Sequence, residues 1–96
     1  MPAGYVIGQM LISDPEQYEK YRAHVVATVK AHGGEFLVRG GPQEVVEGTP
    51  PGPRSVILRF ASVEAAHAWY YSTDYQKIIP IRQGASTGAL TIVEGV

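Results

Sequence analysis

The 96-residue chain contains no cysteine and no asparagine. Without cysteine there are no disulfide bonds, thiolate metal ligands or cysteine nucleophiles, a composition that fits a reducing compartment. Without asparagine there is no acceptor for N-linked glycosylation. No apolar run approaches the ~20 residues that a membrane-spanning helix needs, and the first residues lack the basic segment of a signal peptide. We therefore expect a cytoplasmic protein without a membrane partner.

The chain also lacks an excess of charge of either sign. Eight basic and nine acidic residues give a net charge of −1 and are mixed along the chain, so no basic footprint for nucleic acid is present. The hydrophobic fraction of 45% is ordinary for a globular protein and excludes disorder. A chain of this length predicts a single domain over residues 1–96.

The first part of the chain predicts a strand followed by a long helix. Residues 5–12 are apolar at both alternating sets of positions, which is typical of a strand buried on both faces. Asp14 and Pro15 then form a helix start, because aspartate caps and proline suits the first helical position. The helix is expected to run to about His32 and to end at Gly33, since glycine adopts the left-handed conformation without steric cost.

The remainder predicts three further strands. We expect a strand over residues 35–47 interrupted at 40–42, a turn over 48–53, a strand over 54–61 and a last strand over 87–94. Proline in a strand marks an edge or a bulge because it cannot donate a ladder hydrogen bond. Between the last two strands, Ser62 is expected to cap a short helix reaching about Tyr71. Thr73 and Gln76 predict one or two more helical turns before Pro80.

The order β-α-β-β-α-β predicts an α+β fold. Right-handed crossovers place two helices on one face of a four-stranded antiparallel sheet, the ferredoxin-like plait. The first strand is nevertheless apolar on both faces, so the second face must also be covered. The simplest cover is a second copy of the chain, sheet against sheet, and we predict a homodimer.

Three short motifs have ordinary structural explanations. Residues 84–88 match G-x-S-x-G, but a nucleophile elbow needs a strand before the serine and a helix after it, and the expected order is the reverse. Glycine pairs at 33–34 and 40–41 do not precede a helix, as a phosphate loop requires. Glu64 and His67 have a di-metal spacing without a second glutamate helix, so no metal site is predicted.

Aromatic residues with polar tips are the most informative group in the chain: Tyr18, Tyr21, Trp69, Tyr70 and Tyr75. One interpretation, which covers at least half of them, is the core of a small domain. The other is a mainly aromatic pocket for a small organic ligand, with hydroxyl groups that orient it.

Two arginines fall within expected strands, where burial of a charge is costly. Arg39 shares the alternation of Leu37, and Arg59 that of Ile57. Either each forms an ion pair across the dimer interface, with Glu47 or Glu94 as partner, or they form a fork for an anionic group of a ligand. Arg82 is expected in a loop, at a pocket mouth or in solvent.

The chain resembles the DUF1330 family over nearly its whole length. The residues that carry the resemblance are, in order, Asp14-Pro15-Glu16-x-Tyr18-x-x-Tyr21, His32-Gly33-Gly34-x-Phe36-Leu37-Val38-Arg39-Gly40-Gly41, Glu47-Gly48 and Trp69-Tyr70-x-Ser72-x-x-Tyr75-Gln76. The resemblance implies the dimeric α/β-barrel superfamily, which includes cofactor-free monooxygenases, muconolactone-isomerase-like enzymes, haem-degrading enzymes and chlorite dismutase relatives. In many of these the ligand lies between sheet and helices. The family's own function is uncharacterised, and the resemblance assigns no catalytic role.

Two hypotheses follow. In the first, the protein is an enzyme without a bound cofactor that acts on a small organic molecule. Tyr21, His24 or His32 would transfer protons, and the ligand would be held by Tyr18, Arg39, Trp69, Tyr70 and Tyr75. In the second, it is a non-catalytic dimer that binds a ligand or regulates a partner. The first predicts a cavity of at least a few hundred Å³ that contains a titratable group, whereas the second predicts aromatic rings packed without a cavity.

Overall fold

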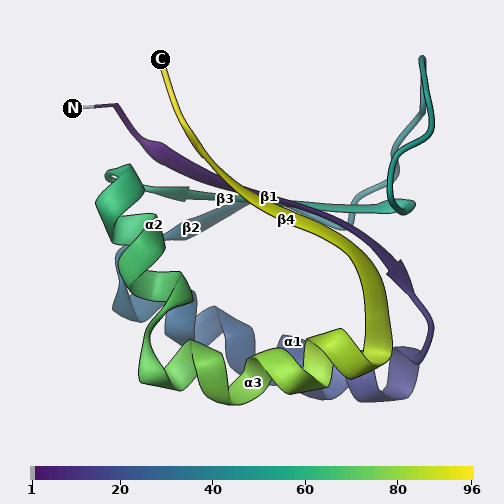
Figure 1. Ribbon diagram of the computed structural model, residues 1–96, viewed down its shortest axis with the longest axis horizontal. Helices are drawn as coiled ribbons and strands as arrows, with labels where there is room; N and C mark the ends of the chain where they lie inside the picture. The colour runs from purple at the N-terminus through teal and green to yellow at the C-terminus, as the bar shows by residue number, and fades with distance from the viewer. Residues whose placement is uncertain (1) are drawn as a thin grey trace.

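The computed structural model describes residues 2–96. The elements are β1 (Gly4–Ile12), α1 (Pro15–Ala31), β2 (Glu35–Arg39), β3 (Arg54–Phe60), α2 (Val63–Tyr70), α3 (Thr73–Ala85) and β4 (Ser86–Glu94). All neighbouring strands are antiparallel, in the order β2-β3-β1-β4. The three helices lie on one side of the sheet, and both termini lie together at one end of it (Figure 1). The predicted α+β ferredoxin-like plait is confirmed.

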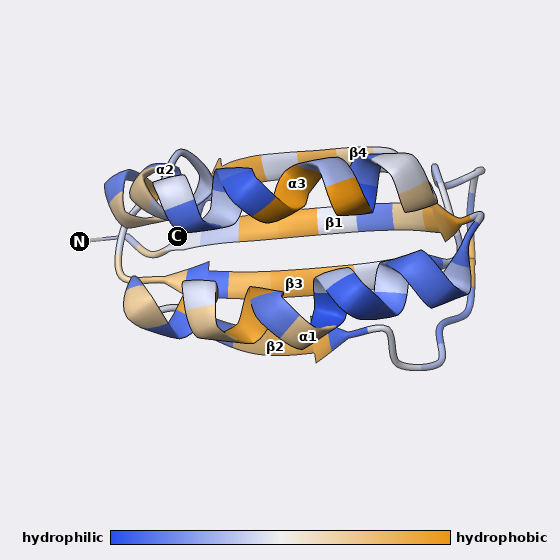
Figure 2. Ribbon diagram, turned by 90° about the horizontal axis from the view of Figure 1, so that it is seen from below, coloured by the Kyte–Doolittle hydropathy of each residue, from blue (hydrophilic) through white to orange (hydrophobic). Residues whose placement is uncertain are grey.

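The helices share the covered face in two halves. Seen from the helix side, α1 runs along β2 and β3, whereas α2 and α3 run along β1 and β4 (Figure 2). Within residues 2–96, no helix has the length and apolar character needed to cross a membrane. The core lies between the sheet and the two rows of helices.

Helix α1 begins and ends as its sequence predicts. The Asp14 carboxylate caps it and accepts a hydrogen bond from the Gln17 backbone N–H at 3.2 Å, with Pro15 in the first turn. Gly33 follows the helix with a φ of +72°, and the backbone N–H of Gly34 donates to the Val29 carbonyl. One stripe of the helix is buried against the sheet: Tyr18, Tyr21, Val25, Thr28 and Val29.

Strand β1 is buried on its helix side only. Val6 and Met10 point into the core, whereas Ile7 and Leu11 on the other face are 36% and 51% exposed. Leu37 of β2 and Val93 of β4 are also exposed. The predicted burial of both faces is therefore not achieved within one chain, and an apolar surface remains on the side without helices.

The predicted long second strand is wrong beyond Arg39. Residues 40–53 form no regular secondary structure, and this loop rises on the side of the sheet opposite the helices (Figure 1). Gly40, with a φ of +69°, turns the chain out of the sheet, and Pro42 lacks the N–H that would continue pairing. The exposed Val45 and Val46 lie on this loop.

A β-bulge reverses the predicted orientation of Arg39. Phe36 pairs with Leu58, but after the bulge Val38 pairs with Ile57 and Arg39 with Val56. Directly paired residues share a face of the sheet, so Arg39 lies on the helix side with Val56. The extra residue in the bulge changes the alternation, which the sequence prediction had carried unbroken from Leu37 to Arg39.

Helix α3 is longer than predicted. Its cap is Ser72, one residue before the expected Thr73, and the Ser72 hydroxyl accepts from the Tyr75 backbone N–H at 3.2 Å. The helix continues through Pro80 to Ala85. Proline removes one intrahelical hydrogen bond, but burial of Ile79, Arg82 and Ala85 retains the helix beyond it. Arg82 is therefore helical and buried instead of lying in a loop.

Candidate functional site

A cavity lies between the sheet and the helices. It encloses about 40 Å³, and the free space around it, including its open mouth, amounts to about 480 Å³. Its walls come from β1, β2, β3 and β4 on one side and from all three helices on the other. Most of the lining is apolar, with three tyrosines, one tryptophan and four arginines among it.

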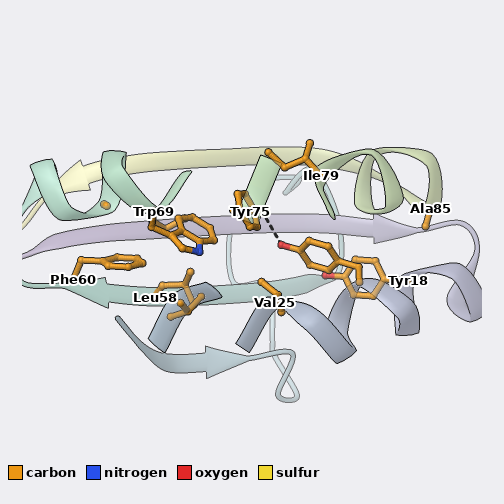
Figure 3. Packing of buried hydrophobic residues seen from close by; sticks show 12 residues of the cluster. Tyr18, Val25, Leu58, Phe60, Trp69, Tyr75, Ile79 and Ala85 are labelled. Atoms are coloured by element: carbon orange, nitrogen blue, oxygen red, sulfur yellow. Dashed lines mark hydrogen bonds between the residues drawn. The ribbon is translucent and has the colours of Figure 1, made fainter. Parts of the chain in front are cut away.

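Packed aromatic rings form the inner end of this space. The rings of Trp69 and Tyr75 lie 4.1 Å apart between centroids, and those of Phe60 and Trp69 lie 5.5 Å apart. Figure 3 shows Phe60, Trp69 and Tyr75 in sequence along the core, with Tyr18 toward the other end. The Trp69 indole donates to the Thr28 hydroxyl at 3.0 Å, and that hydroxyl donates to the Val25 carbonyl at 2.7 Å. These contacts fix the tryptophan ring as a rigid wall.

Two buried tyrosine hydroxyls meet at the centre. The hydroxyls of Tyr21 and Tyr75 are 2.8 Å apart, and the dashed line in Figure 3 marks this hydrogen bond. Burial raises the pKa of both groups, so both are neutral at physiological pH. When one hydroxyl donates to the other, the hydrogen of the second stays available. The pair therefore provides one hydrogen-bond donor for a ligand.

Arg82 places a positive charge beside this pair. Its residue surface is only 9% exposed, and its buried Nε has no hydrogen-bond partner. Arg82 lines the same cavity as Tyr21 and Tyr75, and its charge opposes the rise that burial produces in the pKa of Tyr75. A guanidinium is always protonated, so this site holds a permanent buried cation without a carboxylate partner.

Three more arginines line the cavity from other elements. Arg22 of α1 forms an ion pair with Glu19 at 3.0 Å, and its carbonyl accepts from Arg39 of β2 at 3.4 Å. The guanidinium of Arg54, at the start of β3, lies 5.5 Å from the Tyr18 ring centroid. The Nε atoms of Arg22 and Arg54 are buried without a partner, as in Arg82. No aspartate, glutamate or histidine is among the lining residues.

The structure brings together five of the eight predicted site residues: Tyr18, Tyr21, Arg39, Trp69 and Tyr75. Tyr70 packs against the rings of Trp69 and Tyr75 but does not line the cavity. It faces a separate open hollow together with His67 and Tyr71.

The two histidine candidates lie outside the cavity. His24 is exposed and borders a shallow groove between α1 and α3. His32 caps the end of α1, with its Nδ1 3.1 Å from the Thr28 carbonyl. The structure therefore brings no imidazole to the aromatic cavity. Within residues 2–96, no three acidic or histidine side chains gather where they could hold a metal ion.

Arg59 forms an ion pair within the chain, and its partner is neither of the two expected glutamates. It lies opposite Glu35 in the sheet, and its Nη1 is 3.3 Å from the Glu35 carboxylate. The predicted partners were Glu47 and Glu94 of a second copy. The antiparallel register of β2 with β3 places Glu35 directly opposite Arg59, and this sets the pair.

Two of the four cavity arginines, Arg22 and Arg54, are not among the residues predicted from the sequence, and Arg82 was expected in a loop, at a pocket mouth or in solvent. Arg54 shares the alternation of Val56 and Leu58 in β3, which was a usable signal. Arg82 follows Tyr75 by seven residues, the spacing of one helix face, but the expected helix end at Pro80 concealed it. Arg22 gave no signal of its own, since it directly follows Tyr21 and falls off the buried stripe.

Known structures share this fold. A protein of unknown function from Rhodopseudomonas palustris superposes with a TM-score of 0.80 at 16% identity, covering 99% of this chain and 83% of the other. SnoaB, a cofactor-independent oxygenase from Streptomyces nogalater, gives a TM-score of 0.66 at 11% identity, with 97% and 92% covered. An antibiotic biosynthesis monooxygenase gives 0.56 at 13% identity, with 97% and 96% covered. No curated protein sequence matches.

At these identities the superpositions show a shared fold, that of the ferredoxin-like antibiotic biosynthesis monooxygenase type. The family assignment rests on the sequence itself. The profile of the family described as "Domain of unknown function (DUF1330)" matches residues 3–96. The match includes every strand, every helix and all the cavity residues described above. The chain belongs to the DUF1330 family, whose function is unknown.

Proposed function

We propose that the protein is a homodimeric enzyme, oxygenase-like or isomerase-like and independent of a bound cofactor. Its substrate would be a small organic molecule held between the sheet and the helices. The observation that carries the proposal is Arg82, a buried cation with an unpartnered Nε. Burial of an unpaired charge is costly, and an anion formed on a bound molecule would offset that cost. The shared fold with a cofactor-independent oxygenase supports the same assignment.

The chemistry that this arrangement favours is formation of an oxyanion. Arg82 and the free hydroxyl hydrogen of the Tyr21–Tyr75 pair are donors for a negatively charged oxygen, as in an oxyanion hole. The substrate would lose a proton from a C–H or O–H bond, and the electron pair would remain on the molecule as an enolate or phenolate. An isomerase would return the proton to another carbon. In an oxygenase the carbanion would add to dioxygen and take up a proton to give a hydroperoxide, which would lose water to leave a carbonyl group.

Proton removal needs an acceptor, and none of the cavity residues is a base at neutral pH. The raised pKa values of Tyr21 and Tyr75 make these groups donors. The proton would therefore pass to water, and the cation would assist by lowering the pKa of the bound substrate. On this account Tyr21 and Tyr75 are catalytic residues, Tyr18 and Trp69 form walls, and neither His24 nor His32 takes part.

The size of the cavity favours a second candidate function. Its 40 Å³ is well below the few hundred Å³ expected of an enzyme pocket, and its aromatic rings are tightly packed. A non-catalytic dimer that binds a small ligand fits these two observations. Under the enzyme proposal, the side chains of Arg22, Arg39 and Arg54 would move when substrate enters, because they line the more exposed part of the cavity.

The homodimer belongs to this proposal because of the apolar outer face of the sheet. Ile7, Leu11, Leu37 and Val93 are exposed there, and a second copy packed sheet against sheet would bury them. The loop of residues 40–53 rises on the same side (Figure 1) and would contact the partner through Val45 and Val46. The cytoplasmic location expected from the sequence is part of the same proposal.

Titration of bound para-nitrophenol tests the oxyanion site, because its phenolate is yellow and its phenol is colourless. The wild type should lower the apparent pKa of the bound probe by at least about one unit, an effect that nearby cations commonly produce. Arg82→Gln should remove this shift, and Lys20→Gln, at an exposed position on α1, should retain it. Equal pKa values for free and bound probe, or an unchanged shift in Arg82→Gln, would contradict the proposal.

Hydrogen–deuterium exchange separates the two candidate functions. A panel of enolisable ketones and keto acids is incubated in D2O and followed by NMR. If the protein is an enzyme, at least one compound should exchange its acidic hydrogen faster with the wild type than with Arg82→Gln. Binding of probe without any catalysed exchange would favour the non-catalytic dimer.

A further inference from the structure

We infer that the ligand of this cavity is an organic acid, with a carboxylate held by Arg22, Arg39 and Arg54 in addition to the oxygen near Arg82. The inference rests on the proposed function, since it names the class of molecule that the same site would take. It starts from an imbalance of charge. Four arginines line the cavity, and none of the lining residues is acidic.

The three outer arginines converge from separate elements. Arg22 comes from α1, Arg39 from the end of β2 and Arg54 from the start of β3. The Arg39 guanidinium donates to the Arg22 carbonyl at 3.4 Å and lies 4.7 Å from the Phe36 ring centroid. The Arg54 guanidinium lies over the Tyr18 ring. Aromatic and backbone contacts thus position the charges of Arg39 and Arg54 without neutralising them.

Too few carboxylates are present to balance the group. Glu19 pairs with Arg22 through Nη1 and is the only acidic partner of any cavity arginine in the part of the chain described. The Nε atoms of Arg22 and Arg54 remain buried and without a partner. A guanidinium donates through Nε and Nη together to the two oxygens of a carboxylate. Both arginines line the cavity, and each has an Nε for which the described chain supplies no acceptor.

Gly40 has a specific part in this arrangement. Its φ of +69° favours glycine, and any Cβ at this position would collide with the guanidinium of Arg54. The glycine therefore lets Arg54 lie directly against the backbone at the end of β2. With the bulge that turns Arg39 inward, two local irregularities of one strand bring two arginines to the same place.

The apolar remainder of the cavity identifies the class of anion. Val25, Phe36 and Leu58 line it together with the aromatic rings, so the body of the ligand should be apolar. A bare inorganic anion would leave these walls without contact. A small aromatic or aliphatic carboxylic acid fits both the arginines and the apolar walls. Its carboxylate would lie at the outer arginines, with a second oxygen toward Arg82.

The test compares three probes that differ in one substituent: para-hydroxybenzoate, para-hydroxybenzamide and phenol. Their affinities for the full-length protein are measured by NMR titration. The carboxylate should bind at least about tenfold more tightly than the neutral amide or phenol, as expected for paired guanidinium forks. Arg54→Gln and Arg22→Gln should each reduce this preference, and Lys20→Gln, which also removes one positive charge, should preserve it. Thermal unfolding of each variant shows that it is folded.

The possible results separate the two proposals. If all three probes bind with equal affinity while para-nitrophenol still shows its lowered pKa, the organic-acid inference is wrong and the oxyanion site stands. If no probe binds and no pKa shift is seen, the proposed function fails as well. If inorganic phosphate displaces para-hydroxybenzoate as effectively as benzoate does, the arginines recognise charge alone, and the assignment to a carboxylic acid is overturned.

Discussion

Arg59 and Arg82, on opposite faces of the sheet, are held in opposite ways. On the open face, Arg59 lies in solvent and is paired with Glu35 across two strands. On the covered face, Arg82 is buried, forms no ion pair with any residue of 2–96, and has an Nε without a partner. The difference does not reflect a shortage of acidic residues, since the chain carries nine.

This difference is the reverse of what stability alone would select. An exposed ion pair contributes little, because water screens it, whereas a buried unpaired cation costs several kcal/mol unless something compensates for it. Natural proteins keep such costs mainly at functional sites. The contrast between Arg59 and Arg82 therefore teaches that the covered face is built around a molecule that the chain itself does not supply.

The largest loss of stability should follow removal of the aromatic wall on the covered face. Trp69→Ala deletes a fully buried ring that contacts Phe60 and Tyr75 and should lower the free energy of unfolding by about 3–5 kcal/mol. Tyr71→Ala, at a ring that is 69% exposed, should change it by less than about 0.5 kcal/mol. Urea denaturation measures both, and similar losses would show that the core is not where the structure places it.

A charge placed on the open face should weaken the proposed homodimer and leave the fold of the subunit nearly unchanged. Ile7→Asp places a carboxylate at the centre of the apolar surface, so it should weaken the proposed homodimer by about 3 kcal/mol, or roughly a hundredfold. Its effect on the fold of one subunit should be small. Ala23→Asp, on the exposed surface of α1, is the matched control. Sedimentation equilibrium gives the dissociation constants, and a wild type that is monomeric at all concentrations would refute the dimer.

The tyrosine pair should respond to mutation and to pH. Tyr21→Phe leaves the Tyr75 hydroxyl without its partner and should cost about 1–2 kcal/mol. The double variant Tyr21→Phe/Tyr75→Phe should cost less than the sum of the two single variants, because the second change removes an orphaned hydroxyl. Chemical denaturation of the four proteins gives the coupling energy, and strict additivity would contradict the hydrogen bond.

The same pair predicts alkaline sensitivity. Burial raises the pKa of Tyr21 above its ordinary value of 10.0, so above about pH 10 the unfolded chain loses a proton that the folded chain keeps. Stability from this group is complete below pH 10 and falls above it, by up to about 1.4 kcal/mol per pH unit. Tyr21→Phe should show a shallower fall than the wild type. Identical slopes in denaturation at pH 10–11 would exclude the raised pKa.

Replacement of Arg82 should cause no loss of stability. Arg82→Met replaces a buried cation by an apolar side chain of similar length, and such exchanges are often neutral or stabilising by about 1 kcal/mol or more. Binding of para-nitrophenolate should be lost in the same variant. Arg59→Met should leave both quantities nearly unchanged. Strong destabilisation of Arg82→Met would mean that the arginine serves the fold and not a ligand.

Local sequence patterns were sufficient for the element order and for most of the aromatic cavity. The cap at Asp14, the stripe of α1 and the alternation of Val56, Leu58 and Phe60 each depend on neighbouring residues only. Tyr18, Tyr21, Trp69 and Tyr75 followed from amphipathic side chains at helical spacing. These features are local, so a single sequence contains them.

The arginines of the cavity could not be placed in the same way. The side of the sheet that Arg39 occupies depends on a bulge in the pairing of β2 with β3. The position of Arg82 depends on a helix that passes through Pro80, and buried contacts of its later residues sustain that helix. Both are decided by tertiary contacts, so strand alternation misplaces Arg39, and the low helix propensity of Pro80 misplaces Arg82.

The central claim is that Arg22, Arg54 and Arg82, each with a buried Nε that has no partner on the chain, bind an organic anion. The most direct measurement follows the arginine Nε–H resonances of the ¹⁵N-labelled protein during titration with para-hydroxybenzoate. The account predicts that the signals of Arg22, Arg54 and Arg82 shift and saturate together, while that of Arg59 stays in place. Signals that do not move, or an Arg59 signal that moves as far as the other three, would contradict it.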